Sequence, residues 1–197
     1  MRYFWVRYFV LCAFFVSFTG NSQAIDNTPA QNDASTQLAD LLHSMTPLHN
    51  AASDDQIREY FQFSHVIEDY KAAWIAGTDR YRAHSQPYLP DSFWTDVKAE
   101  MQDTDLAPAF NTWFRHTVSS DLMDKVLDAY LKLGKRFPGS PMCIELGKAQ
   151  SPMGDEWNRL TVLLTRQVIA KVYQADKAKI DEARARYAAE HPGWRER

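Results

Sequence analysis

The sequence predicts an all-α protein, a single helical bundle of about six helices that ends in a long C-terminal helix. Apolar residues recur at three- and four-residue spacing in successive windows, which is the period of an amphipathic helix. No window shows the strict alternation that predicts a strand. Helix-starting Ser and Asp residues and helix-ending Gly residues leave only short connections between the segments, which is typical of a bundle.

The first 24 residues predict a signal peptide that takes no part in the fold. Arg2 and Arg7 provide its positive start, residues 8–18 are an apolar run, and Ser22 and Ala24 supply the small residues of a cleavage site. Eleven apolar residues are too few to span a bilayer as a helix. We therefore expect cleavage after Ala24, a periplasmic or secreted protein, and no stable membrane anchor; the alternative is an uncleaved anchor.

The mature chain predicts a short linker followed by one domain. Residues 25–34 are polar and read as a flexible linker, and residues 35–197 are long enough for one domain with a sizeable core. Cys12 leaves with the signal peptide, so Cys143 has no partner for an internal disulfide. Because its neighbours are apolar, we expect Cys143 to be buried, the alternative being an intermolecular disulfide.

The first two predicted helices differ in the strength of their signals. One is short and stops before Pro47. The next begins after Ser53, which forms a capping-box pattern with Gln56, and a glycine suited to a helix end follows at Gly77. The expected inward face of this second helix consists of Ile57, Tyr60, Phe61, Ile67, Tyr70 and Trp74.

Three helices are predicted between residues 91 and 134. Asp91 is expected to cap the first, Pro108 is tolerable in the first turn of the second, and Ser119 or Ser120 starts the third, which ends at Gly134. Their expected inward faces are Phe93, Trp94, Val97 and Met101; Leu106, Phe110, Trp113 and Phe114; and Leu122, Val126, Leu127, Tyr130 and Leu131.

The C-terminal helix is the longest predicted element. After residues 137–150, expected to be a loop or a turn or two of helix, it starts at Ser151 and runs to Glu190. Its apolar stripe is wide up to Ala175 and then narrows to Ile180, Ala183 and Tyr187. We expect the first part to be buried and residues 176–197 to project, fray or pair with a partner; a solvated charged helix end is the plainer alternative.

Charge excludes one class of partner and disfavours another. The mature chain would carry 20 basic residues against 25 acidic ones, without a run of Lys and Arg. Nucleic-acid binding needs clustered cations that displace counterions, so we exclude it. The same acidity argues against electrostatic adhesion to an anionic membrane.

Motifs that carry chemistry are few. The sequence has no zinc-protease, paired-cysteine, nucleophile-elbow or phosphate-loop pattern, and we assign no catalytic, cofactor-binding or metal residues and no cofactor. His65 and Asp69 have the spacing of two metal ligands on one helix face, with His84 as a third donor. The alternative is an exposed histidine beside an acid.

His116 suggests a second chemical hypothesis, that of a hydrolase. Together with Ser119 or Ser120 and Asp121 it supplies the residue types of a His/Ser/Asp catalytic set. The alternative is that His116 stabilises the C-terminal end of its own helix, while the serines cap the start of the next helix.

Aromatic residues are abundant at core-facing positions. Such residues at helical spacing usually form a core, and the alternative is an imperfectly packed interior that holds a lipid-like or aromatic ligand. The residues in question are Trp74, Trp94, Trp113, Trp157, Phe93, Phe110 and Phe114.

Two motifs together resemble a known family. The segment Leu89-Pro90-Asp91-Ser92-Phe93-Trp94 before a helix, and Ser151-Pro152-Met153-Gly154 opening a long helix, resemble the bacterial exported family called domain of unknown function 2059 over residues 89–175. The chain departs from the family pattern at residues 148–150, where an aromatic residue would be expected. The resemblance implies a helical fold in the periplasm and no particular reaction.

These observations predict an exported, non-enzymatic interaction protein that pairs with itself or with a periplasmic protein through residues 176–197. The alternative is a carrier of a hydrophobic small molecule in the aromatic interior. A hydrolase that uses His116 is the third hypothesis.

Overall fold

A computed structural model describes residues 31–194, with side chains from Ala34 onward. The predicted signal peptide and its cleavage site at Ala24 lie outside the described residues.

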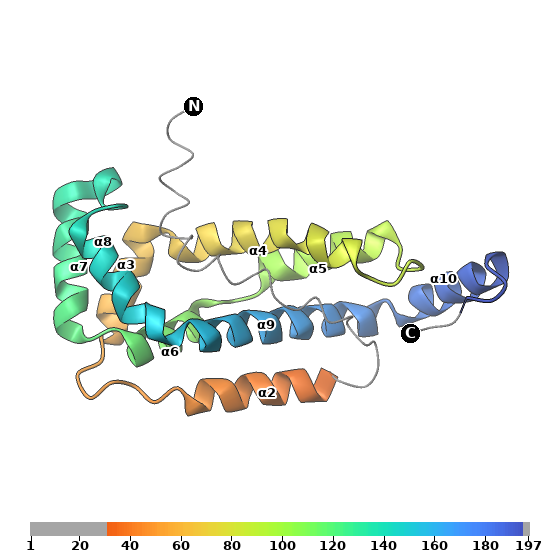
Figure 1. Ribbon diagram of the computed structural model, residues 1–197, viewed down its shortest axis with the longest axis horizontal. Coiled ribbons are helices and arrows are strands. Elements are labelled where there is room, and N and C mark those ends of the chain that lie inside the picture. Colours follow the sequence, from red (N-terminus) through yellow and green to blue (C-terminus); the bar gives the residue numbers. More distant parts are fainter. Residues whose placement is uncertain (1–30, 195–197) are drawn as a thin grey trace. The chain divides into compact units, whose positions relative to one another are not determined.

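The described residues are all helical, as predicted. They form nine α-helices and no strand, and α9 and α10 are separated by Asp176 alone (Figure 1). The helices are α2 (Gln31–Ser44), α3 (Asp54–Ser64), α4 (Val66–Ala83), α5 (Asp91–Asp103), α6 (Ala107–Thr117), α7 (Ser120–Leu133), α8 (Pro141–Gln150), α9 (Gly154–Ala175) and α10 (Lys177–Glu190). Two 3₁₀ helices, η1 (Gly134–Arg136) and η2 (Ser151–Met153), precede α8 and α9.

The helix count exceeds the predicted six for identifiable reasons. The helix expected after Ser53 is two helices, because His65 takes a left-handed backbone conformation with φ 53° and ends α3. Residues 137–150, expected to be a loop or a turn or two of helix, contain the ten-residue α8, which Ser140 caps and Pro141 opens. The predicted single C-terminal helix is divided at Asp176 into α9 and α10, and it starts later than Ser151, after the turn of η2.

Two helix ends also differ from prediction. Gly77 lies inside α4, which continues to Ala83. Pro90, not Asp91, occupies the capping position of α5, and Asp91 is its first helical residue. Asp91 still places an acid in the first turn of α5, where the helix dipole favours it. The first helix, α2, begins at Gln31, inside the expected linker.

The chain divides into two compact units, each described by itself. Of the described residues, the first unit contains 38–70 and 105–161, and the second contains 31–37, 71–104 and 162–194. The divisions fall within α2, α4 and α9, so each of these helices contributes residues to both units.

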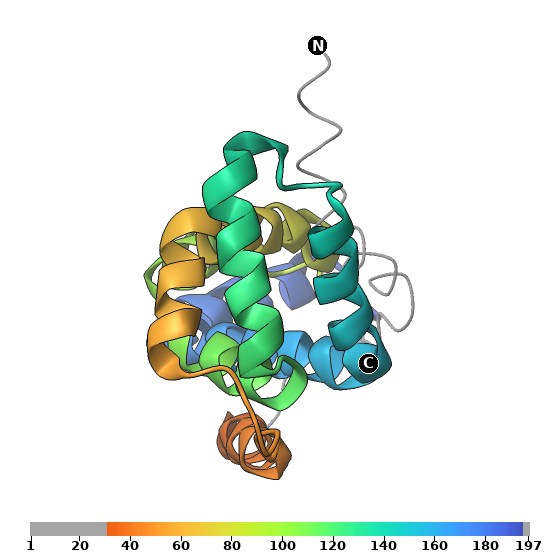
Figure 2. The same ribbon diagram turned by 90° about the vertical axis from the view of Figure 1, so that its left-hand side faces the viewer.

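Helix caps and an aromatic core define the first unit. The predicted capping box is present: Gln56 N–H donates to Ser53 Oγ at 3.2 Å, and Ser53 N–H donates to Gln56 Oε1 at 2.8 Å. The Gln56 side chain also donates to the Ser120 carbonyl, which ties α3 to the start of α7. Helices α7 and α8 follow each other as a hairpin beside α3 (Figure 2).

The rings of this unit meet edge to face. Phe110 lies 5.0 Å from Trp157 and 5.2 Å from Tyr70, measured between ring centroids. Distances and angles of this kind are those of packed aromatic pairs. The Tyr70 hydroxyl is also within 2.9 Å of the buried Thr161 hydroxyl, so the polar group that enters the core with this ring is satisfied.

The second unit is built around α5 and the later parts of α4 and α9. All four residues predicted to face inward on α5 are buried, and so are five residues of α9, namely Leu163, Leu164, Val168, Ile169 and Val172. Trp74 donates its indole N–H to Thr165 Oγ1 at 2.9 Å in the same core. Ion pairs at the rim join Lys98 to Asp79 and Lys171 to Glu100.

Candidate functional site

The C-terminal segment was the predicted interaction surface, and the structure describes it as far as residue 194. It begins with a helix break at Asp176, one residue beyond the predicted change in composition at Ala175. The Asp176 carboxylate is buried and accepts a hydrogen bond from Lys179 Nζ at 2.6 Å. This hydrogen bond holds the pKa of Asp176 below its usual range, against the opposing effect of burial.

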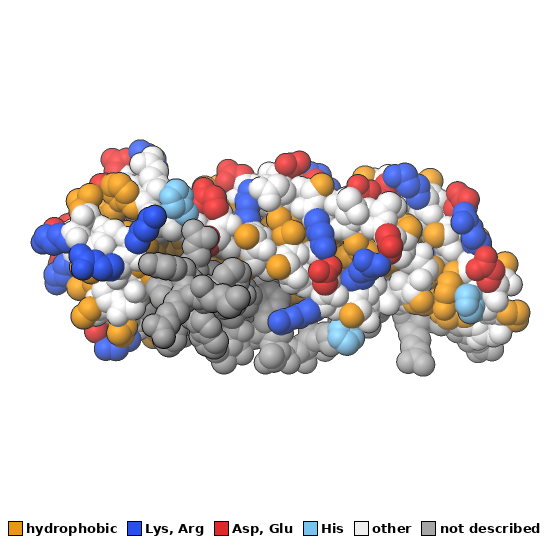
Figure 3. Space-filling view, turned by 90° about the horizontal axis from the view of Figure 1, so that it is seen from above, with side chains coloured by type: hydrophobic (Ala, Val, Ile, Leu, Met, Phe, Trp, Pro, Cys, Tyr) orange, Lys and Arg blue, Asp and Glu red, His pale blue; other side chains and the backbone are white. Residues whose placement is uncertain are grey.

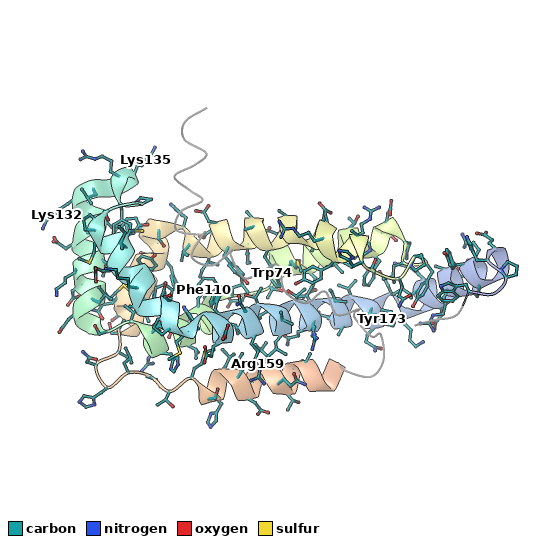
Figure 4. The ribbon with its side chains drawn as sticks, in the orientation of Figure 1. Trp74, Phe110, Lys132, Lys135, Arg159 and Tyr173 are labelled. Atoms are coloured by element: carbon teal, nitrogen blue, oxygen red, sulfur yellow. The ribbon has the colours of Figure 1, made fainter. Side chains whose placement is uncertain are left out.

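The inner side of α10 is attached to its own unit. Ile180 is fully buried. Arg184 donates to the Tyr173 hydroxyl at 2.8 Å, and its guanidinium carbon lies 5.3 Å from the centroid of the Tyr88 ring. Tyr173 is labelled in Figure 4, near the end of α9.

The end of the segment turns back onto the same unit. Trp194 meets Tyr88 edge to face at 5.6 Å and Tyr187 at 5.4 Å. His191 stacks on Tyr187 at 3.9 Å, one helical turn along. As far as Trp194, the segment is therefore docked along one side of its unit.

The outer side of α10 is exposed and combines charge with alanine. Lys177 pairs with Asp181, and Arg186 with Glu182, each at the i, i+4 spacing that supports a helix. Between these pairs lie small exposed side chains, namely Ala178, Ala185, Ala188 and Ala189. A helix with this surface permits close approach of a second helix but offers little apolar area to it.

A different surface was missed by the sequence analysis. Leu131, predicted to face inward on α7, is 67% exposed, and Ile144 on α8 is 54% exposed. Lysine side chains extend from the same end of α7 (Figure 4, where Lys132 and Lys135 are labelled). The signal that could have found this surface is the absence of any Asp or Glu between residues 129 and 144.

The structure does not assemble the residues of the hydrolase hypothesis. His116 Nδ1 lies 2.7 Å from the Thr46 carbonyl oxygen, and since that oxygen only accepts, Nδ1 carries the proton. Ser119 Oγ accepts the Leu122 N–H as the cap of α7, and Ser120 Oγ donates to Gln56 Oε1 at 3.1 Å. Ser119 is thus the cap that was predicted as Ser119 or Ser120, and Ser120 is the first residue of α7.

The residues of the metal hypothesis do not lie in the arrangement that was predicted for a metal site. His65 lies between α3 and α4 rather than on one helix with Asp69, because of its left-handed backbone. His84 follows the end of α4 and belongs to the other unit. Within the part of the chain that the structure describes, no group of three or more His, Cys, Asp or Glu side chains could hold a metal ion.

Cys143 is half-buried rather than buried. It lies on α8, and its backbone N–H donates to Ser140 Oγ at 3.2 Å. The neighbouring aromatic groups are strongly shielded from water. Burial raises the pKa of Tyr130 to about 12 and that of Tyr60 further still.

The aromatic interior of the first unit holds one unsatisfied donor. Trp113 is 1% exposed, and its indole N–H has no acceptor among the described atoms. Its ring lies 5.0 Å from that of Trp157. The ring contacts are those of a packed core, while the indole N–H is a donor that a bound oxygen atom could satisfy.

Comparison with protein-family models, with curated proteins and with solved structures found no match to this chain. The resemblance of residues 89–175 to the exported helical family therefore stays a prediction. No helix among residues 31–194 is both long enough and apolar enough to cross a membrane.

Proposed function

We propose that this protein is an exported, non-enzymatic interaction protein, a helical bundle that binds a second copy of itself or a periplasmic protein through residues 176–197. The observation that carries the proposal is the surface of α10. Of its fourteen residues only Ile180 is buried, so its own unit covers one narrow line of the helix. Isolated helices of this length are marginal in water, and most helical stability comes from packing.

The docking contacts are compatible with that role. Arg184, Tyr187 and Trp194 hold the helix to Tyr88 in a fixed orientation, which leaves the alanine-bearing side outward. A preoriented helix loses less conformational entropy on binding than a free one. The ion pairs of the outer side keep the unbound helix soluble.

The test is native mass spectrometry of the protein isolated from the periplasm of an expressing bacterium. We expect a dimer, or a complex with a co-purified protein, that is lost in the variant Ala185→Glu/Ala189→Glu. The matched control is Ala72→Glu/Ala76→Glu, which places two glutamates at the same spacing on exposed positions of α4. A monomer in the parent protein, or equal loss in both variants, would refute the proposal.

Deletion of residues 176–197 is a less selective test, because the structure shows that it also uncovers Tyr88 and Tyr173. The double substitution leaves those contacts in place. Denatured mass measured on the same sample reports whether cleavage occurs after Ala24.

A second candidate function rests on the Trp113 indole N–H. A hydrophobic small molecule with an oxygen acceptor would satisfy this buried donor. Organic extraction of purified protein should then yield a stoichiometric compound, and Trp113→Phe should reduce its recovery. Extracts without any such compound count against a carrier.

A further inference from the structure

The connection between α7 and α8 forms a protruding tip. It comprises residues 129–144, called the basic tip below. Figures 1 and 2 show the end of α7 and this connection extending beyond α3 within the first unit. Gly134 and Gly139 supply the turns, with φ values of 52° and 86° that side-chain-bearing residues rarely adopt.

The basic tip is anchored from inside. Phe137 is fully buried and stacks on Tyr130, with ring centroids 3.8 Å apart and planes 21° apart. Ser140 then caps α8. The outward side chains are therefore carried by a fixed turn, not by a loose loop, and their exposure is a property of the fold.

The outward side chains are apolar and cationic. Leu131 lies in the last turn of α7 and Ile144 in the first turns of α8, and each exposes more than half of its surface. Pro141 is exposed as well. Such residues are normal when scattered singly, but here they occur at both ends of one turn that also carries charge.

The charge of the basic tip has one sign. Residues 129–144 contain Lys132, Lys135 and Arg136 and no acid. Lys132 pairs with Asp128, just outside the tip. Among residues 34–194, no carboxylate lies within ion-pair distance of Lys135 or Arg136, both of which are exposed. In Figure 3, Lys and Arg side chains lie among hydrophobic ones over the α7 end of this unit.

We propose that the basic tip docks on an anionic lipid surface, with Lys135 and Arg136 near the phosphates and Leu131 and Ile144 at the boundary of the acyl chains. Charge complementarity identifies the occupant, because unpaired cations are attracted to an anionic surface. The exposed apolar side chains add binding free energy when they leave water for the bilayer boundary. Such binding is reversible and peripheral. It adds a second binding surface to the one on α10 and does not depend on it.

An acidic protein would satisfy the charges equally well, but two features favour the bilayer. The tip protrudes, whereas a helix-binding surface is usually a groove. The apolar side chains lie on the helix turns that adjoin the protruding connection, where they can reach the bilayer boundary while the rest of α7 and α8 stays outside.

The test is sedimentation of the purified full chain with phosphatidylcholine vesicles, with or without about 30% phosphatidylglycerol. We expect stronger binding to the anionic vesicles. Lys135→Glu/Arg136→Glu should weaken it by at least about 25-fold, since the loss of each cation costs about fivefold and the new glutamates are repelled by the anionic surface. Leu131→Ser/Ile144→Ser, which keeps the charge, should weaken it about tenfold.

The matched control is Arg58→Glu/Arg80→Glu, which makes the same change in net charge at two exposed positions outside the tip. It should bind nearly as well as the parent protein. Circular dichroism of each variant checks that the helices remain. Equal binding to neutral and anionic vesicles, or equal losses in the two charge-reversal variants, would overturn the proposal. Binding to poly-glutamate but not to anionic vesicles would overturn it in favour of an acidic protein partner.

Discussion

Replacement of Ile180 by alanine measures how firmly α10 is attached to the second unit. Ile180 is fully buried and is the only residue of α10 that is. Loss of three buried carbon atoms and the cavity they leave typically lowers the free energy of unfolding by about 2–5 kcal/mol. If α10 unfolds together with its unit, this full loss will appear, and the melting temperature should fall by about 2–4 °C per kcal/mol.

A smaller loss of unfolding free energy would indicate that α10 detaches on its own. When α10 detaches before the rest unfolds, the measured loss cannot exceed the free energy that holds α10 in place. Urea unfolding followed by circular dichroism gives the global value, and amide hydrogen exchange over residues 177–190 gives the local one. The control is Glu182→Ala, which removes an exposed partner of Arg186 and should change stability by less than about 0.5 kcal/mol. If Ile180→Ala cannot be distinguished from this control in both measurements, the attachment described here is wrong.

Two further predictions concern helix ends. Ser53→Ala removes the oxygen that accepts the Gln56 N–H and should lower the free energy of unfolding by about 1 kcal/mol in a urea titration; Ser92→Ala, at an exposed position inside α5, should lower it less. Asp176→Asn should make the free energy of unfolding fall less steeply as the pH is lowered into the acid range. Because the pKa of Asp176 is lowered in the folded protein from an ordinary value near 3.8, its contribution is present above that pH and is lost as the pH falls through the folded-state pKa. Parent and variant should therefore converge in acid, and a constant difference down to the lowest pH would contradict the assignment.

Burial was the most predictable property of the chain. The apolar stripe on the first part of the long helix is buried except at Tyr173, and so are all four predicted residues on α5 and the four predicted at the start of α6 and along it. The buried residues of the stripe are Trp157, Leu160, Leu163, Leu164, Val168, Ile169 and Val172. A regular three- and four-residue spacing places these side chains on one stripe, and a stripe as wide as this must be covered by neighbouring helices. The helix break at Asp176 was not predicted, since one continuous helix was expected to run to Glu190, although the change in stripe width was placed at Ala175.

Helix ends were less predictable because tertiary packing competes with local preference. Gly77 would end an isolated helix, and glycine inside a helix costs about 1 kcal/mol relative to alanine. Burial of Trp74 and Thr78 in the second unit holds α4 together across that position. His65 shows the reverse case, a helix that ends without glycine or proline, where the Ser64 hydroxyl accepts the Val66 N–H as the next helix begins.

The two candidate surfaces also differ in how far the sequence predicts them. The C-terminal surface was predicted because its composition changes along one helix, a pattern that sequence displays directly. The basic tip was not, because Leu131 fits the apolar period of α7 and only the packing of α7 shows that none of the described helices covers it. Periodicity reveals which side of a helix is apolar, but the width of the stripe that neighbours cover is a tertiary property.

The membrane contact proposed for the basic tip differs from the expectation based on net charge for a physical reason. The whole chain carries −3, yet residues 129–144 carry three cations and no acid, so the remainder is more acidic than the average suggests. Electrostatic interactions between exposed groups fade over about 8 Å at physiological salt. A surface that approaches the basic tip therefore responds to the charges within that distance, not to the sum over the molecule. A protein with a negative net charge can therefore bind an anionic surface through a local group of cations. The position of its charges matters more for such binding than their sum.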